Sequence, residues 1–337
     1  MMFINPSNRL TDYVVKKGLI KDGPLTFLDA GCSGGICHFL RLYEPFLSGL
    51  GIDPVVGEIR RLKASEKNQG ISYCEAFLKG SSPSRDDAYT TMNPWSRFSS
   101  AAAMDKIRLI NPPKKSLSLL NLWNAEKLSR VHLTLDQACL QSDLRGADFI
   151  KIDVDGPDYE ILQSGEGFIR QAPTLGILLE VNFYGGAGTG ENTFHNIDRL
   201  MRAWGYDLFG LFPRKYSMSA LPNAFEWDCP AQSVTGRPYQ GDAFYALDWV
   251  ASAQVRERLS PLQILKLACL FENFSLPDVS AELLIHAGKL LPNIDLGHCL
   301  DLLTFSFRQG RANYRSHLAQ FEKDPASFYR SRHQEHW

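Results

Sequence analysis

The stretch Phe27-Leu-Asp-Ala-Gly-Cys-Ser-Gly-Gly35 decides the fold of this chain. It is an apolar run typical of a buried β-strand, and it leads directly into a glycine-rich loop. Further along, Gly51-Ile-Asp-Pro54 ends a second apolar run with an acidic residue. A glycine loop lets the backbone approach a ligand closely, and an acid ending the next strand can accept both hydroxyls of a ribose. Together the two stretches predict a pocket for a nucleoside-containing cofactor.

The sequence around these stretches alternates between short apolar runs and segments with helical spacing. We expect strands at residues 25–30, 50–53 and 71–77, with helices at residues 36–47 and 56–67. Strands that alternate with helices in this way are typical of a parallel sheet with right-handed crossovers.

The same pattern resumes in the second half of the chain. Residues 147–153 and 174–181 are nearly continuous apolar runs, as expected of buried strands. The remaining elements predicted here are helices at 158–163 and 192–204 and strands at 206–212 and 242–248. The sequence therefore predicts an α/β fold with seven strands.

Two regions depart from this alternation. Residues 80–130 form a long insertion rich in Ser, Pro, Asn and aromatic residues, and so long a connection is usually functional or mobile. After Pro261 only helices are expected, at residues 262–273, 278–291 and 296–309, followed by a frayed tail at 314–337. We therefore expect a main domain at residues 1–250 and an all-α appendage with its tail at 251–337.

Composition restricts the kinds of partner. Lys and Arg number 36 against 37 Asp and Glu, so no broad charge favours nucleic acid or an anionic membrane. No run is long enough for a membrane span, and the first ten residues do not resemble a signal peptide. Seven scattered cysteines without a CxxC pair suit reduced thiols in a cytosol, which predicts a cytoplasmic protein.

The charge in front of the glycine loop narrows the choice of cofactor. The loop lacks the GK[ST] of a P-loop, and Gly31, Gly34 and Gly35 give GxxGG in place of GxGxxG. Asp29 would repel a pyrophosphate and attract the ammonium group of an amino acid. S-adenosylmethionine carries that ammonium together with a ribose for Asp53. The alternative is that Asp29 only caps the following helix and the glycines only make a tight turn.

The block Ala147-Asp-Phe-Ile-Lys-Ile-Asp-Val-Asp-Gly-Pro-Asp-Tyr-Glu-Ile-Leu162 adds a second, more specific motif. Together with the two stretches above, it resembles the FkbM family of S-adenosylmethionine-dependent methyltransferases, which carry a strand running into IDVEGxExxxL. The resemblance covers residues 25–248 and includes Thr134-Leu-Asp-Gln137 and Leu178-Leu-Glu-Val-Asn182. It does not cover the helical appendage.

This resemblance implies a class I methyltransferase fold, which is Rossmann-like, with a mostly parallel sheet in the order 3-2-1-4-5-7-6. It also implies O-methylation, usually of a sugar or a polyketide-like metabolite. Three positions depart from the family pattern: Asp155 and Asp53 stand where Glu is commoner, and Pro157-Asp158 follows the glycine. The acidic character is kept, so the departures concern the placement of the acceptor more than that of the cofactor.

Methyl transfer to a hydroxyl requires alignment of the acceptor oxygen and removal of its proton. Asp153 is the expected base or orienting group, because it ends a strand beside the ligand crevice. The adenine is expected near Glu75 and Ala76. The candidate catalytic residues are Asp153, Asp155, Glu180, Asn182 and His195. The expected cofactor-binding residues are Asp29, Gly31, Cys32, Ser33, Gly34, Gly35, Asp53, Pro54, Glu75, Ala76 and Asp153.

Several of these residues have a structural alternative. Asp155 could cap the helix near Pro157, Glu180 could form a buried salt bridge with Lys151, and His195 could be an exposed helix residue. No metal site is predicted, although a divalent ion bridging Asp153 and nearby carboxylates stays open. In the insertion, Trp95, Arg97 and Phe98 suit either sugar stacking or the packing of a surface loop.

The sequence thus predicts a methyltransferase that acts on a hydroxyl group. The expected acceptor is a sugar of a surface polysaccharide or of a glycosylated metabolite. Two rival functions remain at this point. One is a nicotinamide-dependent oxidoreductase, which the GxxGG spacing and Asp29 disfavour. The other is a non-catalytic scaffold that binds a partner through its helical C-terminal segment. The sequence does not identify a protein partner for that segment.

Overall fold

The computed structural model describes residues 4–81, 128–183, 188–216, 236–304 and 307–325, apart from residues 6, 155, 156, 189 and 191. The strands are β1 (Leu25–Ala30), β2 (Leu47–Asp53), β3 (Ile71–Glu75), β4 (Phe77–Leu78), β5 (His132–Leu133), β6 (Phe149–Ile152), β7 (Gly176–Asn182), β8 (Asp207–Tyr216) and β9 (Arg237–Ala246). The helices are α1 (Arg9–Lys16), η1 (His38–Tyr43), α2 (Val56–Ser65), α5 (Leu135–Gln141), α6 (Asp158–Ser164), α7 (Glu166–Gln171), α8 (Phe194–Ala203), α9 (Ala253–Arg258), α10 (Pro261–Asn273), α11 (Pro277–Ala287), η4 (Gly288–Leu290), α12 (Leu296–Leu303) and α13 (Phe307–Lys323).

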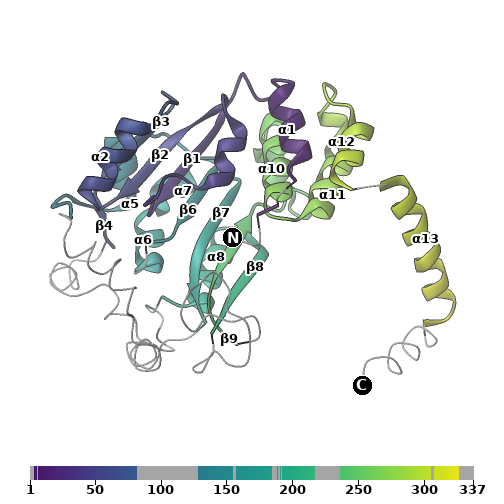
Figure 1. Ribbon diagram of the computed structural model, residues 1–337. Coiled ribbons are helices and arrows are strands. Elements are labelled where there is room, and N and C mark those ends of the chain that lie inside the picture. Colours follow the sequence, from purple (N-terminus) through teal and green to yellow (C-terminus); the bar gives the residue numbers. More distant parts are fainter. Residues whose placement is uncertain are drawn as a thin grey trace.

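Seven strands form one mixed sheet in the order β3-β2-β1-β6-β7-β9-β8, with helices packed around it (Figure 1). The neighbouring strands from β3 to β7 pair in parallel, and β9 runs antiparallel between β7 and β8. Every residue of β6 and β7 is buried, in keeping with a parallel sheet covered on both faces. The predicted α/β fold with a mostly parallel sheet is confirmed. Numbered along the chain within this sheet, the strands lie in the order 3-2-1-4-5-7-6.

The total number of strands differs from the prediction. Two short strands, β4 and β5, pair in parallel as a separate sheet, with Phe77 beside His132. Phe77 was expected to end the third strand, but the chain leaves the main sheet at Ala76, whose N–H donates to the carbonyl of Asp53 (3.2 Å). The sequence pattern of so short a pair of strands is too weak to be recognised.

The predicted helix at residues 36–47 is wrong. Only His38–Tyr43 is helical, as a 3-10 turn, and β2 already begins at Leu47. Pro45 explains the early end, because the residue before a proline is disfavoured in the helical region. Glu44 accordingly has an extended backbone, with φ −63° and ψ 138°.

Strand β8 runs longer than expected, through Pro213 to Tyr216. The predicted strand ends at residue 212, directly before Pro213, which cannot donate to a sheet hydrogen bond. Because β8 lies at the edge of the sheet, the missing N–H of Pro213 is tolerated there.

Helix α10 is buried along most of its length and packs into the core of the sheet. Phe274 at its C-terminal end stacks on Phe244 of β9, with ring centroids 3.9 Å apart, and also contacts Phe149 of β6. Lys266 of α10 forms a buried ion pair with Asp148, the residue before β6 (2.7 Å). Helix α10, which lies after the predicted boundary, therefore shares the core of the sheet, and that boundary at residue 250 stays a prediction.

Helix α1, near the N-terminal end of the chain, packs against α10 and α12. Figure 1 shows α1 beside α10 and α12. The Glu272 carboxylate of α10 accepts the N–H groups of Leu10 and Thr11 in the first turn of α1, at 2.7 and 2.8 Å. A carboxylate at a helix N-terminus satisfies donors that have no partner within the helix. This contact fixes α1 against the helical segment.

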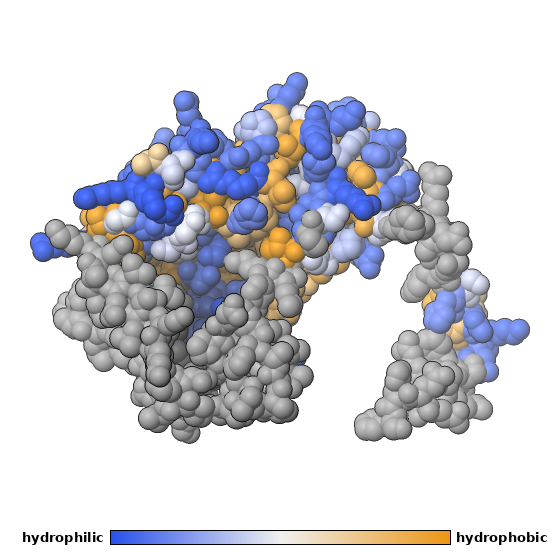
Figure 2. Space-filling view, in the orientation of Figure 1, coloured by the Kyte–Doolittle hydropathy of each residue, from blue (hydrophilic) through white to orange (hydrophobic). Residues whose placement is uncertain are grey.

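The last helices also differ from expectation. The helix predicted at residues 296–309 ends at Leu303, and α13 covers part of the segment expected to be a frayed tail. Figure 1 shows α13 extending away from the other helices. No helix among the described residues is long and apolar enough to cross a membrane. The face shown in Figure 2 is largely hydrophilic, with apolar side chains gathered near its middle.

Candidate active site

Acidic residues from four strands lie side by side where the parallel strands end. Asp53 is the last residue of β2 and pairs in register with Glu75 of β3. On the other side of the sheet, Glu180 of β7 pairs in register with Asp242 of β9. In-register neighbours point to the same face of a sheet. The sheet therefore brings acidic side chains from both of its halves to one end.

Asp153 joins this row from the centre of the sheet. It follows Ile152, which lies opposite Ala30 of β1 and Leu179 of β7, so the next residues on those strands are Gly31 and Glu180. The N–H of Asp153 donates to the carbonyl of Ala30 at 3.0 Å. Asp153 therefore follows the carboxyl end of β6, and its role toward a ligand stays a prediction.

Gly31 shows why the first position of the loop must be a glycine. Its φ is +87°, and a Cβ atom added there would lie 1.8 Å from the backbone oxygen of Asp153. A side chain would therefore separate the loops that follow β1 and β6. At Gly34, with φ +86°, nothing lies within 4 Å of an added Cβ atom, so the middle of the loop borders open space.

Asp29 is buried directly behind the loop. Its Oδ2 atom accepts the N–H of Cys37 at 2.7 Å, which ties the start of the loop to the residue before η1. Its Oδ1 atom is buried without a hydrogen bond, and Lys151 Nζ lies 3.5 Å away. Burial raises the pKa of Asp29, and the positive charge of Lys151 opposes that rise. Asp29 thus supports the loop, as the structural alternative held, and keeps one oxygen for a further donor.

Lys151 was missed as a site residue by the sequence analysis. Its ammonium group lies 3.2 Å from Asp153 Oδ2, 3.5 Å from Asp29 Oδ1 and 3.5 Å from the carbonyl of Gly31. The side chain is nearly buried, and the carboxylates of Asp29 and Asp153 raise its pKa well above the ordinary range. The strand alternation Lys151-Ile-Asp153 was a usable signal, because residues two apart point to the same face. A lysine here partly neutralises two of the predicted carboxylates.

Asp53, the last residue of β2, lies beside Ser33 of the glycine loop. It accepts the N–H of Val55 at 2.8 Å, and hydrogen bonds from Ser33 help to hold its charge. Burial nevertheless raises the pKa of Asp53. The carbonyl of Pro54 accepts the N–H of Ser129 at 2.7 Å. Ser33 and Asp53, both predicted to face the cofactor, are therefore neighbours.

The remaining loop residues divide between the core and the surface. Cys32 is buried, whereas Ser33 and Gly34 are exposed. The N–H of Gly34 donates to the Glu58 carboxylate of α2 at 2.8 Å. Glu75 is half-buried and Ala76 is buried, next to the end of β2.

These features fit S-adenosylmethionine. Asp29 Oδ1 is a buried acceptor whose neighbouring cation, Lys151 Nζ, lies at 3.5 Å, the exposed part of the loop borders open space, and Asp53 lies beside it. A buried polar atom without a partner is uncommon and calls for an explanation such as a ligand. The carboxylates of Asp29 and Asp53 are thus suited to accept hydrogen bonds from a cofactor that carries both an ammonium group and ribose hydroxyls.

The acceptor side contains an ion-pair network that differs from the suggested pair of Glu180 with Lys151. Glu180 is buried and forms its ion pair with Arg214 of β8, and Gln240 Nε2 lies 3.3 Å from the same carboxylate. Arg214 also lies 3.8 Å from Asp242 Oδ1. Burial raises the pKa of Asp242 to about 6, opposed by the charge of Arg214 and increased by that of Asp153. Neither Arg214 nor Asp242 stood out in the sequence, because only the antiparallel register brings them to Glu180.

Asn182 and His195 have different environments. Asn182 is buried at the end of β7; its Nδ2 donates to the carbonyl of Asn192 (3.2 Å), and its Oδ1 has no hydrogen bond. His195 is exposed in the first turn of α8, with Nε2 3.4 Å from Thr193 Oγ1. The structure therefore places Asn182 in the strand-end row and His195 on the helix surface.

Two groups of predicted residues lie outside the described part of the chain. Asp155 is one of them, so the capping role considered for it stays a prediction; the described N-cap residue of α6, Pro157, makes no side-chain cap, and Asp158 in the first turn accepts the N–H of Val154 at 2.9 Å. Trp95, Arg97 and Phe98 of the insertion are also outside the described residues. Within the described ranges, no group of three His, Cys, Asp or Glu side chains is arranged to hold a metal ion.

Comparison with known proteins gives one family model that matches part of the chain. The model named Methyltransferase FkbM domain matches residues 67–208, less than half of the chain. That range includes Lys151, Asp153, Glu180 and Asn182 and excludes the glycine loop. No curated protein matches the chain.

Several solved structures match the chain at low sequence identity and low TM-score. Magnesium protoporphyrin IX methyltransferase from Synechocystis, crystallised with S-adenosylmethionine, has 9% identity and a TM-score of 0.32, with 72% of this chain and 79% of that chain covered. Precorrin-6y C5,15-methyltransferase from Geobacter metallireducens has 11% identity and a TM-score of 0.32, covering 70% and 86%. A methyltransferase from Aquifex aeolicus has 9% identity and a TM-score of 0.31, covering 73% and 96%.

Proposed function

We propose that this chain, an S-adenosylmethionine-dependent methyltransferase with an FkbM domain, methylates a hydroxyl group of a sugar. The observation that carries the proposal is the row formed by Asp153, Glu180 and Asp242, with the unpartnered Oδ1 of Asn182 beside it. These groups are hydrogen-bond acceptors, and they suit a ligand that presents several O–H donors.

The cofactor supplies a methyl group that its sulfonium has already activated for transfer. On this proposal Asp29 and the loop from Gly31 to Gly35 hold the methionine and ribose parts. Asp53 accepts the ribose hydroxyls, and the adenine lies near Glu75 and Ala76. The supporting observations are the buried Oδ1 of Asp29, which has no hydrogen bond among the described residues, and the open space beside Gly34.

The chain's own residues must then align the acceptor oxygen and take its proton. Asp153 was predicted as a base or an orienting group. Lys151 Nζ lies 3.2 Å from its Oδ2 atom, and this ion pair fixes the position of the carboxylate, which favours the orienting role. Asn182 Oδ1 is the second orienting group, because it can accept the hydroxyl proton in a hydrogen bond.

Asp242 is the proposed proton acceptor. Its pKa of about 6 lies closer to neutral pH than that of an ordinary aspartate, and a base works best when its pKa is near the working pH. Its side chain is 16% exposed, so a proton can leave to solvent. Glu180 and Arg214 hold Asp242 in place through their shared ion pairs. Asp155 and His195 stay predictions as catalytic residues.

A sugar is the proposed substrate class because its neighbouring hydroxyl groups can each donate a hydrogen bond to a carboxylate or amide oxygen of this row. The carboxylates and the amide of Asn182 would also give selectivity, since an acceptor lacking those hydroxyls leaves buried polar groups unpaired. Figure 2 shows hydrophilic side chains near the end of β7 (Figure 1), where this row lies. We propose a surface polysaccharide or a glycosylated metabolite as the source of the sugar.

The test is transfer of a labelled methyl group from S-adenosylmethionine to panels of sugars, phenols and amines, with product masses as readout. Wild-type protein should methylate a sugar, and Asp153→Asn should keep cofactor binding and lose turnover. The matched control is Asp136→Asn on α5, which should keep turnover. Transfer only to phenols or amines would contradict the acceptor class, and unaltered turnover by Asp153→Asn would remove its role.

A further inference from the structure

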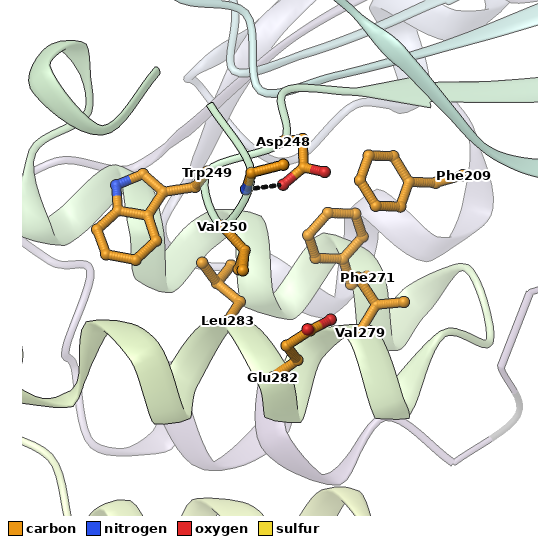
Figure 3. A pocket seen from close by; sticks show the side chains of 9 residues that line it. Phe209, Asp248, Trp249, Val250, Phe271, Val279, Glu282 and Leu283 are labelled. Carbon is orange, nitrogen blue, oxygen red and sulfur yellow. Dashed lines mark hydrogen bonds between the residues drawn. The ribbon is translucent and has the colours of Figure 1, made fainter. Parts of the chain in front are cut away.

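A cavity of about 180 Å³ lies between the sheet and the helical segment. Its walls come from β8, the turn after β9, α10 and α11 (Figure 3). The cavity is smaller than the ~300–1,000 Å³ of sites for drug-sized ligands and larger than the ~30 Å³ occupied by one water. It therefore suits a small ion or one functional group of a larger molecule.

The cavity lies at the end of the sheet opposite the candidate active site. Ala246, the last residue of β9, pairs with Gly176, the first residue of β7, and with Asp207, the first residue of β8. The lining residues Phe209 and Asp248 are close to these positions, at the amino ends of the parallel strands. None of the residues proposed for methyl transfer lines the cavity.

Two aromatic rings form part of the wall. The ring centroids of Phe209 and Phe271 are 4.7 Å apart, with an angle of 47° between the planes. Leu283 and Val279 line the same cavity, and Trp249 contributes to its edge (Figure 3). The faces of aromatic rings carry partial negative charge and attract cations.

Two carboxylates complete the lining. In Figure 3 the carboxylates of Asp248 and Glu282 appear on opposite sides of the Phe271 ring. Asp248 Oδ1 accepts the N–H of Ala251 at 2.8 Å, and Glu282 is exposed on α11. Among the described residues, neither carboxylate is paired with Lys, Arg or His. The cavity thus combines aromatic walls with two negative charges that lack a positive partner.

We propose that this cavity binds a small organic cation, an alkylammonium group. Asp248 and Glu282 supply charge, Phe209 and Phe271 supply ring faces, and Leu283 packs against the alkyl part. An anion would be repelled by both carboxylates. A bare metal ion is disfavoured because two carboxylates and apolar walls cannot complete its oxygen shell.

The experiment uses the full chain labelled with 5-fluorotryptophan, with the Trp249 resonance assigned by a Trp249→Phe variant. Tetramethylammonium chloride is titrated at constant ionic strength, and tert-butanol serves as the neutral compound of similar shape. We expect a saturable shift of the Trp249 resonance with tetramethylammonium only. Glu282→Gln should weaken that binding about tenfold, because it removes one of two charges. Glu257→Gln, an exposed residue of α9 outside the cavity, should not change it.

Equal shifts with tert-butanol, a shift that does not saturate, or unchanged binding by Glu282→Gln would each overturn the proposal. A capped lysine, N-acetyl-lysine methylamide, distinguishes the source of the cation. Binding of the capped lysine comparable to that of tetramethylammonium means that the group can arrive on a peptide side chain. Binding of tetramethylammonium alone means a free small molecule. Both outcomes support the cation site.

Discussion

Lys151 Nζ lies 3.2 Å from Asp153 Oδ2, and both side chains point to the same face of the sheet at the carboxyl end of β6. The strand spacing of two residues creates this contact, and the parallel neighbour β1 adds Asp29 on the other side of the ammonium group. A single buried lysine therefore balances two carboxylates at the centre of the candidate site.

Lys151→Met should destabilise the protein by about 3–5 kcal/mol, because it leaves buried carboxylates without their cation. Burial already raises the pKa of Asp29, and loss of Lys151 should raise it further. A raised carboxyl pKa in the folded state costs stability as pH rises through it. Urea unfolding should therefore show a larger loss at pH 8 than at pH 5. The exposed Lys63→Met is the control, and a loss of equal size at both pH values would contradict the charge balance.

Asp242→Asn should abolish most turnover and yet stabilise the fold at pH 8. The pKa of Asp242 is raised from 3.8 to about 6, so the ionised form costs stability above pH 6, by about 3 kcal/mol. That cost disappears below pH 4, where the group is protonated in both states. Urea unfolding at pH 8 and pH 4 measures the difference, which should shrink at the lower pH.

The pH profile of the wild-type enzyme checks the same residue. If Asp242 accepts the proton, kcat/KM should rise with pH through about 6, and the exposed Asp278→Asn should keep that profile. A flat profile between pH 5 and 8 would contradict its role as base.

Glu58→Gln should tighten cofactor binding about threefold, because a charged acceptor holds a donor roughly twice as strongly as a neutral one. Glu58 now accepts the N–H of Gly34 in the loop proposed to hold the methionine part. Calorimetry with S-adenosylhomocysteine measures the change. Weaker binding would mean that Glu58 supports the loop and does not compete with the ligand.

Lys266→Met should destabilise the protein by about 3–5 kcal/mol, since Asp148 would stay buried without a cation. The exposed Lys289→Met should change stability by no more than about 0.5 kcal/mol. Urea unfolding followed by circular dichroism compares the two. A loss below about 1 kcal/mol for Lys266→Met would contradict the view that α10 is part of the core of the sheet.

The central sheet was predictable because its strands are buried on both faces and so form continuous apolar runs. Gly31 and Asp53 were predictable for a related reason. Gly31 follows one of these apolar runs and Asp53 ends another, both at the carboxyl ends of parallel strands. The helix predicted at residues 36–47 is wrong because the spacing of apolar residues does not show the effect of Pro45, which disfavours a helical backbone at Glu44. The extension of β8 through Pro213 depended on its edge position, which only the assembled sheet reveals.

The charge network was less accessible from the sequence. Glu180 was correctly singled out as an acid at the end of a strand, but its partner Arg214 lies on β8 and reaches it through the register of two antiparallel pairs. Asp242 was assigned to a strand without a role. Its raised pKa is a product of burial among charges from several strands, which no local pattern encodes.

The most direct measurement is calorimetry of S-adenosylhomocysteine binding to the wild-type chain and to Asp53→Ala. The account predicts one binding site in the wild type and an affinity lower by about tenfold or more in Asp53→Ala, because two hydrogen bonds to a carboxylate are lost. Binding of equal affinity in the two proteins, or no binding to the wild type, would contradict the proposed cofactor site.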